Sequence, residues 1–85
     1  MKNFNINNKK ERIEVMALFG YEMTPCEPLS FKRYGEVKTE EVTELLEARV
    51  RFADGFACHF FDVMVGRKKH RLEFDSKNLY WYLVA

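Results

Sequence analysis

The last thirty residues of the chain constrain its fold most strongly, because apolar and polar side chains alternate there between short turn signals. Asp54-Gly55 comes directly before this part, and turn-forming residues divide it at Gly66 and at the segment 75–78. The stretches between these turns are rich in β-branched and aromatic residues: 56–65, 70–74 and 79–85. The pattern predicts a meander of three antiparallel strands. Its predicted core positions are Leu72, Phe74, Trp81 and Leu83.

Two of these strands are apolar on both faces. In 56–65, Phe56, Phe60 and Met64 alternate with Phe61, Val63 and Val65, and 79–85 shows the same two-sided pattern. A half-exposed antiparallel sheet would instead carry polar residues on one face. Either the sheet curls and segment 12–23 covers its second face, or a protein partner or a second copy of the chain does. The predicted interface residues for the second case are Phe61, Val63, Tyr80 and Tyr82.

Two earlier stretches are ambiguous in their periodicity. Apolar residues in 9–19 and 40–50 fit a strand, but the spacing of Val42, Leu45 and Leu46 also fits a helix. After the first of these stretches, Pro25 and Pro28 predict a turn or an irregular connection. We therefore expect an all-β fold of about five to six strands in a strongly curled antiparallel sheet or barrel. The alternative is an α+β fold with one helix at residues 9–19 or 40–50.

Length and composition predict one domain. The chain has 85 residues, 47% of them hydrophobic, which is too many for a disordered chain of this charge content. We expect a flexible leader over 1–11 and a single β-rich domain over 12–85. There is no apolar run of signal-peptide or membrane-spanning length, so the expected location is the cytoplasm, without membrane contact.

Charge is balanced overall but uneven along the chain. Fourteen Lys and Arg against thirteen Asp and Glu give a net charge of +1. Residues 36–56 carry six acids and three bases, whereas residues 57–85 carry five bases and three acids. Folding can turn this asymmetry into one acidic and one basic face or interleave the charges.

The most basic run, residues 66–71, falls on the predicted hairpin turn after 56–65. Such a tip is suited to contact nucleic-acid phosphates. The competing interpretation is an ordinary solvated turn, because lysines at hairpin tips and edges also protect any β protein from aggregation. The residues predicted for the nucleic-acid interpretation are Arg67, Lys68, Lys69, Arg71, Lys32 and Arg33.

No pattern in the chain predicts catalysis. The two serines, Ser30 and Ser76, lie in no nucleophile motif, and the four glycines form no phosphate-binding loop. The candidate zinc ligands Cys26, Cys58, His59 and His70 include no closely spaced pair that could begin a site. We therefore expect no enzyme activity, no metal and no cofactor, with free thiols at both cysteines.

Four short motifs resemble a small bacterial domain of unknown function: Phe31, Arg33 and Gly35; Val63, Val65 and Gly66; Leu72, Phe74 and Asp75; Trp81 and Leu83. This domain occurs alone or, in related form, near the C-terminal end of proteins similar to Y-family translesion DNA polymerases. The likeness covers about 60 residues and rests on mostly structural positions. The family typically has a tryptophan in its middle stretch, where this chain has Leu-Leu-Glu-Ala-Arg-Val-Arg-Phe.

The resemblance implies an all-β fold and a link to DNA-damage tolerance through protein or nucleic-acid contacts, with no catalytic residues to carry over. Together with the residue patterns it predicts a non-catalytic binding or interaction module, an accessory protein in DNA-damage tolerance. The alternatives are a nucleic-acid-binding β domain that uses hairpin 66–71 and a structural homo-oligomer without a nucleic-acid role.

Overall fold

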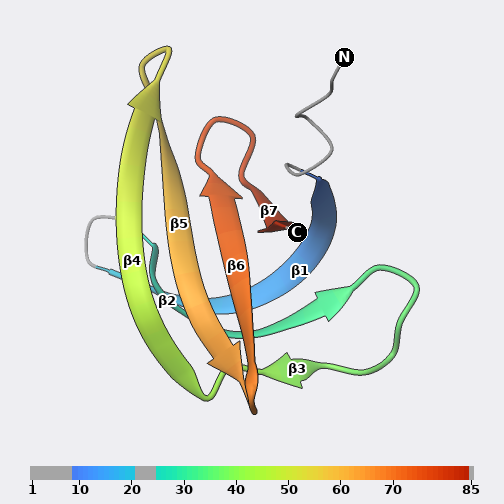
Figure 1. The fold of residues 1–85 in the computed structure, drawn as a ribbon. Coiled ribbons are helices and arrows are strands. Elements are labelled where there is room, and N and C mark those ends of the chain that lie inside the picture. The colour runs from blue at the N-terminus through green and yellow to red at the C-terminus, as the bar shows by residue number, and fades with distance from the viewer. Residues whose placement is uncertain (1–8, 21–24, 85) are drawn as a thin grey trace, which may run out of the picture.

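The chain folds into one antiparallel β-sheet of seven strands (Figure 1). The computed structural model describes residues 9–20 and 25–84 and shows no helix in them. The predicted all-β class is therefore confirmed, and the alternative with a helix at 9–19 or 40–50 is wrong. In chain order the strands are β1 (Lys10–Phe19), β2 (Pro25–Arg33), β3 (Glu40–Glu41), β4 (Glu44–Ala53), β5 (Phe56–Val65), β6 (Lys68–Asp75) and β7 (Tyr80–Val84).

The sheet curls into a half-barrel. Its strand order is β3-β2-β1-β7-β6-β5-β4, so the first long strand pairs with the last one, and β3 and β4 form the two edges. Only Val42 and Thr43 separate these two edge strands in the chain. The Val42 amide donates to the Leu29 carbonyl on β2 (2.9 Å), and the Thr43 amide donates to the Met64 carbonyl on β5 (2.8 Å). The chain therefore ties the two halves of the sheet together at this corner, and β1 and β2 pass behind β4–β6 (Figure 1).

The C-terminal meander is confirmed. β5 pairs with β6 and β6 pairs with β7, both antiparallel. Asp54 and Gly55 join β4 to β5 with φ angles of 55° and 80°, and Ala53 lies opposite Phe56. Two successive positive φ angles define the type I′ turn whose twist matches a hairpin, which explains the Asp-Gly pair.

The core lies on the inner face of the curled sheet. Its members come from β1, β2, β5, β6 and β7: Ile13, Phe31, Phe61, Val63, Leu72, Phe74, Trp81 and Leu83. All four predicted core residues are among them. Phe74 and Trp81 lie directly opposite each other on β6 and β7, with ring centroids 4.9 Å apart. Cross-strand aromatic contacts of this kind stabilise a sheet in addition to the area they bury.

The outer face carries aromatic residues that are covered by long cationic side chains. The Arg12 guanidinium lies 3.6 Å from the centre of the Tyr80 ring. Three further cations lie over rings at 5.3 to 5.5 Å: Lys10 over Tyr82, Arg51 over Phe60 and Lys77 over Phe56. Cations attract the faces of aromatic rings, and their aliphatic stems shield apolar surface. The cations shield these rings in part, since Phe56 and Tyr80 stay 44% and 39% exposed, and segment 12–19 is a strand within the sheet and not a cover.

The number of strands and the starts of β1 and β2 differ from expectation. There are seven strands and not five to six, because Glu40 and Glu41 pair with β2 although two consecutive glutamates carry no strand signal. β2 begins at Pro25, so both prolines belong to a strand and not to the predicted turn or irregular connection, although their pairing with β1 is itself irregular. Prolines are tolerated in this part of β2 because no second partner strand lies beside it in the described structure, and the β1–β2 pairing contains two register shifts.

β1 begins at Lys10, inside the expected leader 1–11, of which residues 1–8 lie outside the described residues. No helix in the described part of the chain has the length and apolar content that a bilayer crossing requires.

Candidate nucleic-acid interface

The β5–β6 turn presents the basic run that the sequence singled out. Val65 and Lys68 lie opposite each other, so Gly66 and Arg67 form a two-residue turn. Gly66 has φ of 59°, while Arg67 keeps a negative φ. A positive φ at the first turn position alone is the type II′ hairpin geometry, which glycine adopts without strain. Arg67 is exposed at this turn, and Lys68 and Lys69 begin β6.

Strand pairing brings basic residues from other parts of the chain to the same place. Arg71 on β6 lies opposite Val84 on β7, and Val84 lies opposite Lys10 at the start of β1. Arg33 at the end of β2 lies opposite Ile13, farther along β1. Together these strands form a cavity of about 520 Å³, which we call the basic cavity. It is lined by Lys9, Lys10, Glu11, Arg33, Lys68, Lys69, His70, Arg71, Leu83 and Val84.

Six cations and one carboxylate therefore line this cavity. Three of the cations form ion pairs: Arg71 with Asp62 (2.8 Å), Lys10 with Glu73 (3.0 Å) and Arg33 with Glu11 (3.8 Å). The other three, Lys9, Lys68 and Lys69, have no carboxylate within 4.0 Å in the described structure. Since each ion pair neutralises one cation, three positive charges remain uncompensated at the cavity.

His70 is a half-buried titratable residue in the lining of the basic cavity. Its ring packs edge-to-face on Phe31 of β2, with centroids 5.6 Å apart. Burial lowers the pKa of His70, and the charges of Arg33 and Lys68 lower it further, against a smaller opposing effect of Glu40. The imidazole is therefore neutral near pH 7, and it can accept a hydrogen bond or gain a proton when an anion arrives.

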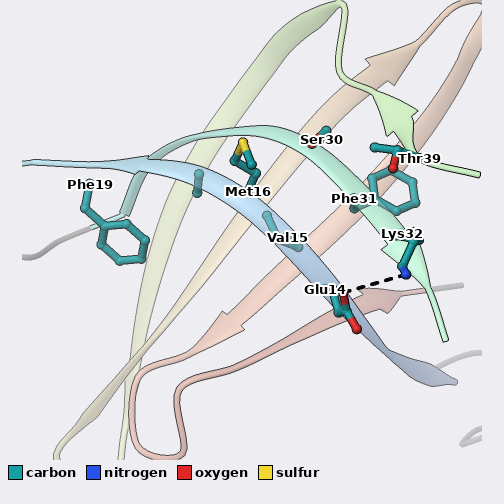
Figure 2. A pocket seen from close by; sticks show the side chains of 9 residues that line it. Glu14, Val15, Met16, Phe19, Ser30, Phe31, Lys32 and Thr39 are labelled. Carbon is teal, nitrogen blue, oxygen red and sulfur yellow. Dashed lines mark ion pairs between the residues drawn. The ribbon is translucent and has the colours of Figure 1, made fainter.

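Four of the six predicted nucleic-acid-binding residues line the basic cavity: Arg33, Lys68, Lys69 and Arg71. Arg67 lies at the turn and is not among the lining residues. Lys32 lies elsewhere, in a separate cavity of about 600 Å³ along β1 and β2, where its ammonium is 4.0 Å from the Glu14 carboxylate (Figure 2).

Sequence reasoning missed Lys9 and Lys10, which it assigned to the leader. No local pattern could have placed them here, because they reach the site through the pairing of β1 with β7, the opposite end of the chain.

The four residues predicted as a protein interface do not share one surface. Phe61 and Val63 are core residues, 1% and 0% exposed, on the inner face. Tyr80 and Tyr82 lie opposite Asp75 and Glu73 on the outer face, beneath Arg12 and Lys10.

The candidate zinc ligands are also dispersed over both faces. The Cys58 thiol on the outer face donates to Glu73 Oε2 (3.7 Å), and burial followed by the Glu73 charge raises the pKa of that thiol. The His59 ring stacks on Phe61 at the inner face, and burial lowers its pKa. The Cys26 side chain lies outside the described residues. Among the side chains that the structure describes, no three His, Cys, Asp or Glu residues are close enough to hold a metal ion.

Comparison with known proteins does not link the chain to a family. No protein-family model, no curated protein and no solved structure matches it. The resemblance to the polymerase-associated bacterial domain stays a prediction.

Proposed function

We propose that this chain is a non-catalytic module that binds the phosphate backbone of nucleic acids through the basic cavity. The observation that carries the proposal is the concentration of charge. Six of the fourteen Lys and Arg residues line one cavity with a single acidic neighbour, in a chain whose net charge is only +1. A local excess of this kind attracts polyanions even where the protein as a whole is nearly neutral.

The distribution of these cations over three strands and the segment before β1 argues against an ordinary solvated turn. Lysines that only protect a hairpin tip need no support from distant strands. Here Lys9 from the segment before β1 and Arg33 from β2 line the same cavity as Lys68 and Lys69 of β6. Collecting like charges costs electrostatic energy, which binding of an anion would offset.

The lining also indicates what part of a nucleic acid fits. It contains no Phe, Tyr or Trp ring on which a base could stack. Lysine ammonium groups bind phosphates as point charges and carry no information about base sequence. The expected binding is therefore independent of sequence. An accessory role in DNA-damage tolerance, which the resemblance implies, is compatible with such a contact to DNA.

The test measures binding of fluorescent single- and double-stranded oligonucleotides by anisotropy as a function of salt, beginning at about 50 mM. The test variant is Lys68→Ala with Lys69→Ala. The control, Lys32→Ala with Lys38→Ala, removes the same charge away from the cavity. We expect the wild type and the control to bind with equal salt slopes. In the test variant the slope should fall by about two units, one for each lost phosphate contact.

Two results would contradict the proposal. One is an absence of wild-type binding at the lowest salt concentration. The other is an equal loss in the test and control variants, which would assign any binding to overall charge. Thermal unfolding of both variants checks that neither substitution disturbs the sheet.

A further inference from the structure

β4 is a long strand with an unpaired edge. It has ten residues, pairs with β5 with one β-bulge at Leu46, and has no other partner in the described sheet. All its residues except Leu45 are exposed. The backbone N–H and C=O groups that alternate residues direct away from β5 thus form a row ready to pair with another strand.

The other edge of the sheet differs in this respect. β3 has only two residues, and the part of β2 that it leaves unpaired contains Pro25 and Pro28, which have no backbone N–H to donate. On β4, in contrast, exposed apolar side chains accompany the free backbone: Leu46, Val50 and Phe52 are 44%, 49% and 72% exposed. Apolar side chains on a long edge strand favour pairing with a further strand.

The charges along β4 are self-complementary about one position. In an antiparallel pair of identical strands, a two-fold axis through Ala48 places Glu47 of each copy opposite Arg49 of the other. No like charges face each other in this register, and Glu47 to Arg49 lie on the regular part of β4, beyond the β-bulge that leaves Leu46 without a partner on β5. An axis through Arg49 would oppose two arginines directly, and an axis through Val50 would oppose Arg49 and Arg51. Opposite charges directly across a strand pair stabilise it, and like charges destabilise it.

We propose that a second copy of this chain pairs antiparallel with β4, centred on Ala48, and joins the two sheets into one. The pairing uses main-chain hydrogen bonds for affinity and the Glu47–Arg49 pairs for register. Within each copy the Arg49 guanidinium already lies 3.6 Å from the Glu47 carboxylate, and both side chains are half-exposed. In the dimer these two charges and their counterparts form a network of four alternating charges. The basic cavity takes no part in this interface, because none of its lining residues belongs to β4.

The competing role for these charges is protection, since charged residues on an edge strand also prevent association. The experiment distinguishes the two by charge exchange. Sedimentation equilibrium is measured for the wild type, for Glu47→Arg, for Arg49→Glu and for an equimolar mixture of the two variants. In either variant alone, two like-charge contacts replace two opposite-charge contacts, so the dissociation constant should rise about tenfold or more. In the mixture, each introduced charge meets its opposite, and a heterodimer should form.

A matched control keeps this test separate from nucleic-acid binding. Lys69→Ala, in the basic cavity, should leave the dimer dissociation constant unchanged. A wild type that remains monomeric at about 100 μM would overturn the proposal. So would single variants that associate as strongly as the wild type, or a mixture that associates no better than its components. Equal unfolding midpoints of the wild type and both variants establish that the fold is retained.

Discussion

The Arg71 guanidinium donates two hydrogen bonds to the Asp62 carboxylate across β5 and β6, from Nε to Oδ1 (2.8 Å) and from Nη2 to Oδ2 (3.2 Å). The two residues lie directly opposite each other in the strand register. The Asp62 side chain is 8% exposed and that of Arg71 is 42% exposed. The Arg71 hydrogen bonds hold the pKa of Asp62 below its ordinary value. Arg71 is thus the cation that forms an ion pair with Asp62 among the described residues, and the same pair neutralises the charge that Arg71 could offer to a ligand.

This pair predicts an asymmetric response to substitution. Arg71→Ala leaves a buried carboxylate without its partner and should lower the free energy of unfolding by about 1–2 kcal/mol. Asp62→Asn with Arg71→Ala should cost less than the sum of the two single substitutions, because no unpaired charge remains. Urea unfolding of the three variants and the wild type measures this coupling. Additive effects would show that the two groups do not interact energetically.

The same pair predicts a gain in anion affinity. Asp62→Asn removes the carboxylate that neutralises Arg71, so the net positive charge beside the basic cavity rises by one. We expect tighter oligonucleotide binding and a steeper salt dependence, by about one unit if Arg71 then contacts a phosphate. Anisotropy titrations of Asp62→Asn and the wild type at several salt concentrations test this. Glu41→Gln, which adds the same charge at the β3 edge, is the control and should change neither quantity to the same extent.

The two histidines predict loss of stability in mild acid. Burial lowers the pKa of both His59 and His70 below the ordinary value of 6.5. As the pH falls from about 7 to about 5.5, the unfolded chain therefore takes up protons before the folded one, and the free energy of unfolding decreases. Urea unfolding at several pH values measures the decrease. A double variant, His59→Phe with His70→Phe, should lose most of this pH dependence, and equal slopes for the two proteins would contradict the assignment.

Elements whose contacts are close in sequence could be predicted, and elements whose partners are distant in sequence could not. Hairpins such as the one at Asp54-Gly55 were predictable, because turn chemistry and strand alternation are local signals. The strand at Lys10–Phe19 was ambiguous, because its partners are β2 and the distant β7, and only those partners decide between strand and helix. The short strand β3 could not be predicted from the sequence, since its two residues form a strand only by pairing with β2.

The candidate site divides in the same way. Lys68, Lys69 and Arg71 were predicted because they follow one another at a recognisable turn. Lys9 and Lys10 were missed, because nothing near them in the sequence indicates that β1 pairs with β7. Periodicity also could not show that Tyr80 and Tyr82 are shielded by Arg12 and Lys10, which reach them across strands.

The backbone conformation of Leu79 indicates that a substitution there can stabilise the fold. Its φ of 61° lies in the left-handed region that side chains with a Cβ adopt only at a cost, and its side chain is 71% exposed, so little packing would be lost. The conformation closes the β6–β7 turn, where the Leu79 amide donates to the Asp75 carbonyl (2.7 Å). Leu79→Gly should therefore raise the free energy of unfolding by about 0.5–1 kcal/mol, the relief of strain less the extra entropy of an unfolded glycine. Leu79→Ala is the matched control: it removes the same exposed apolar group but keeps the Cβ, and it should give no gain. If urea unfolding shows that both variants change stability equally, the effect lies in the side chain, and the backbone at this turn is not strained.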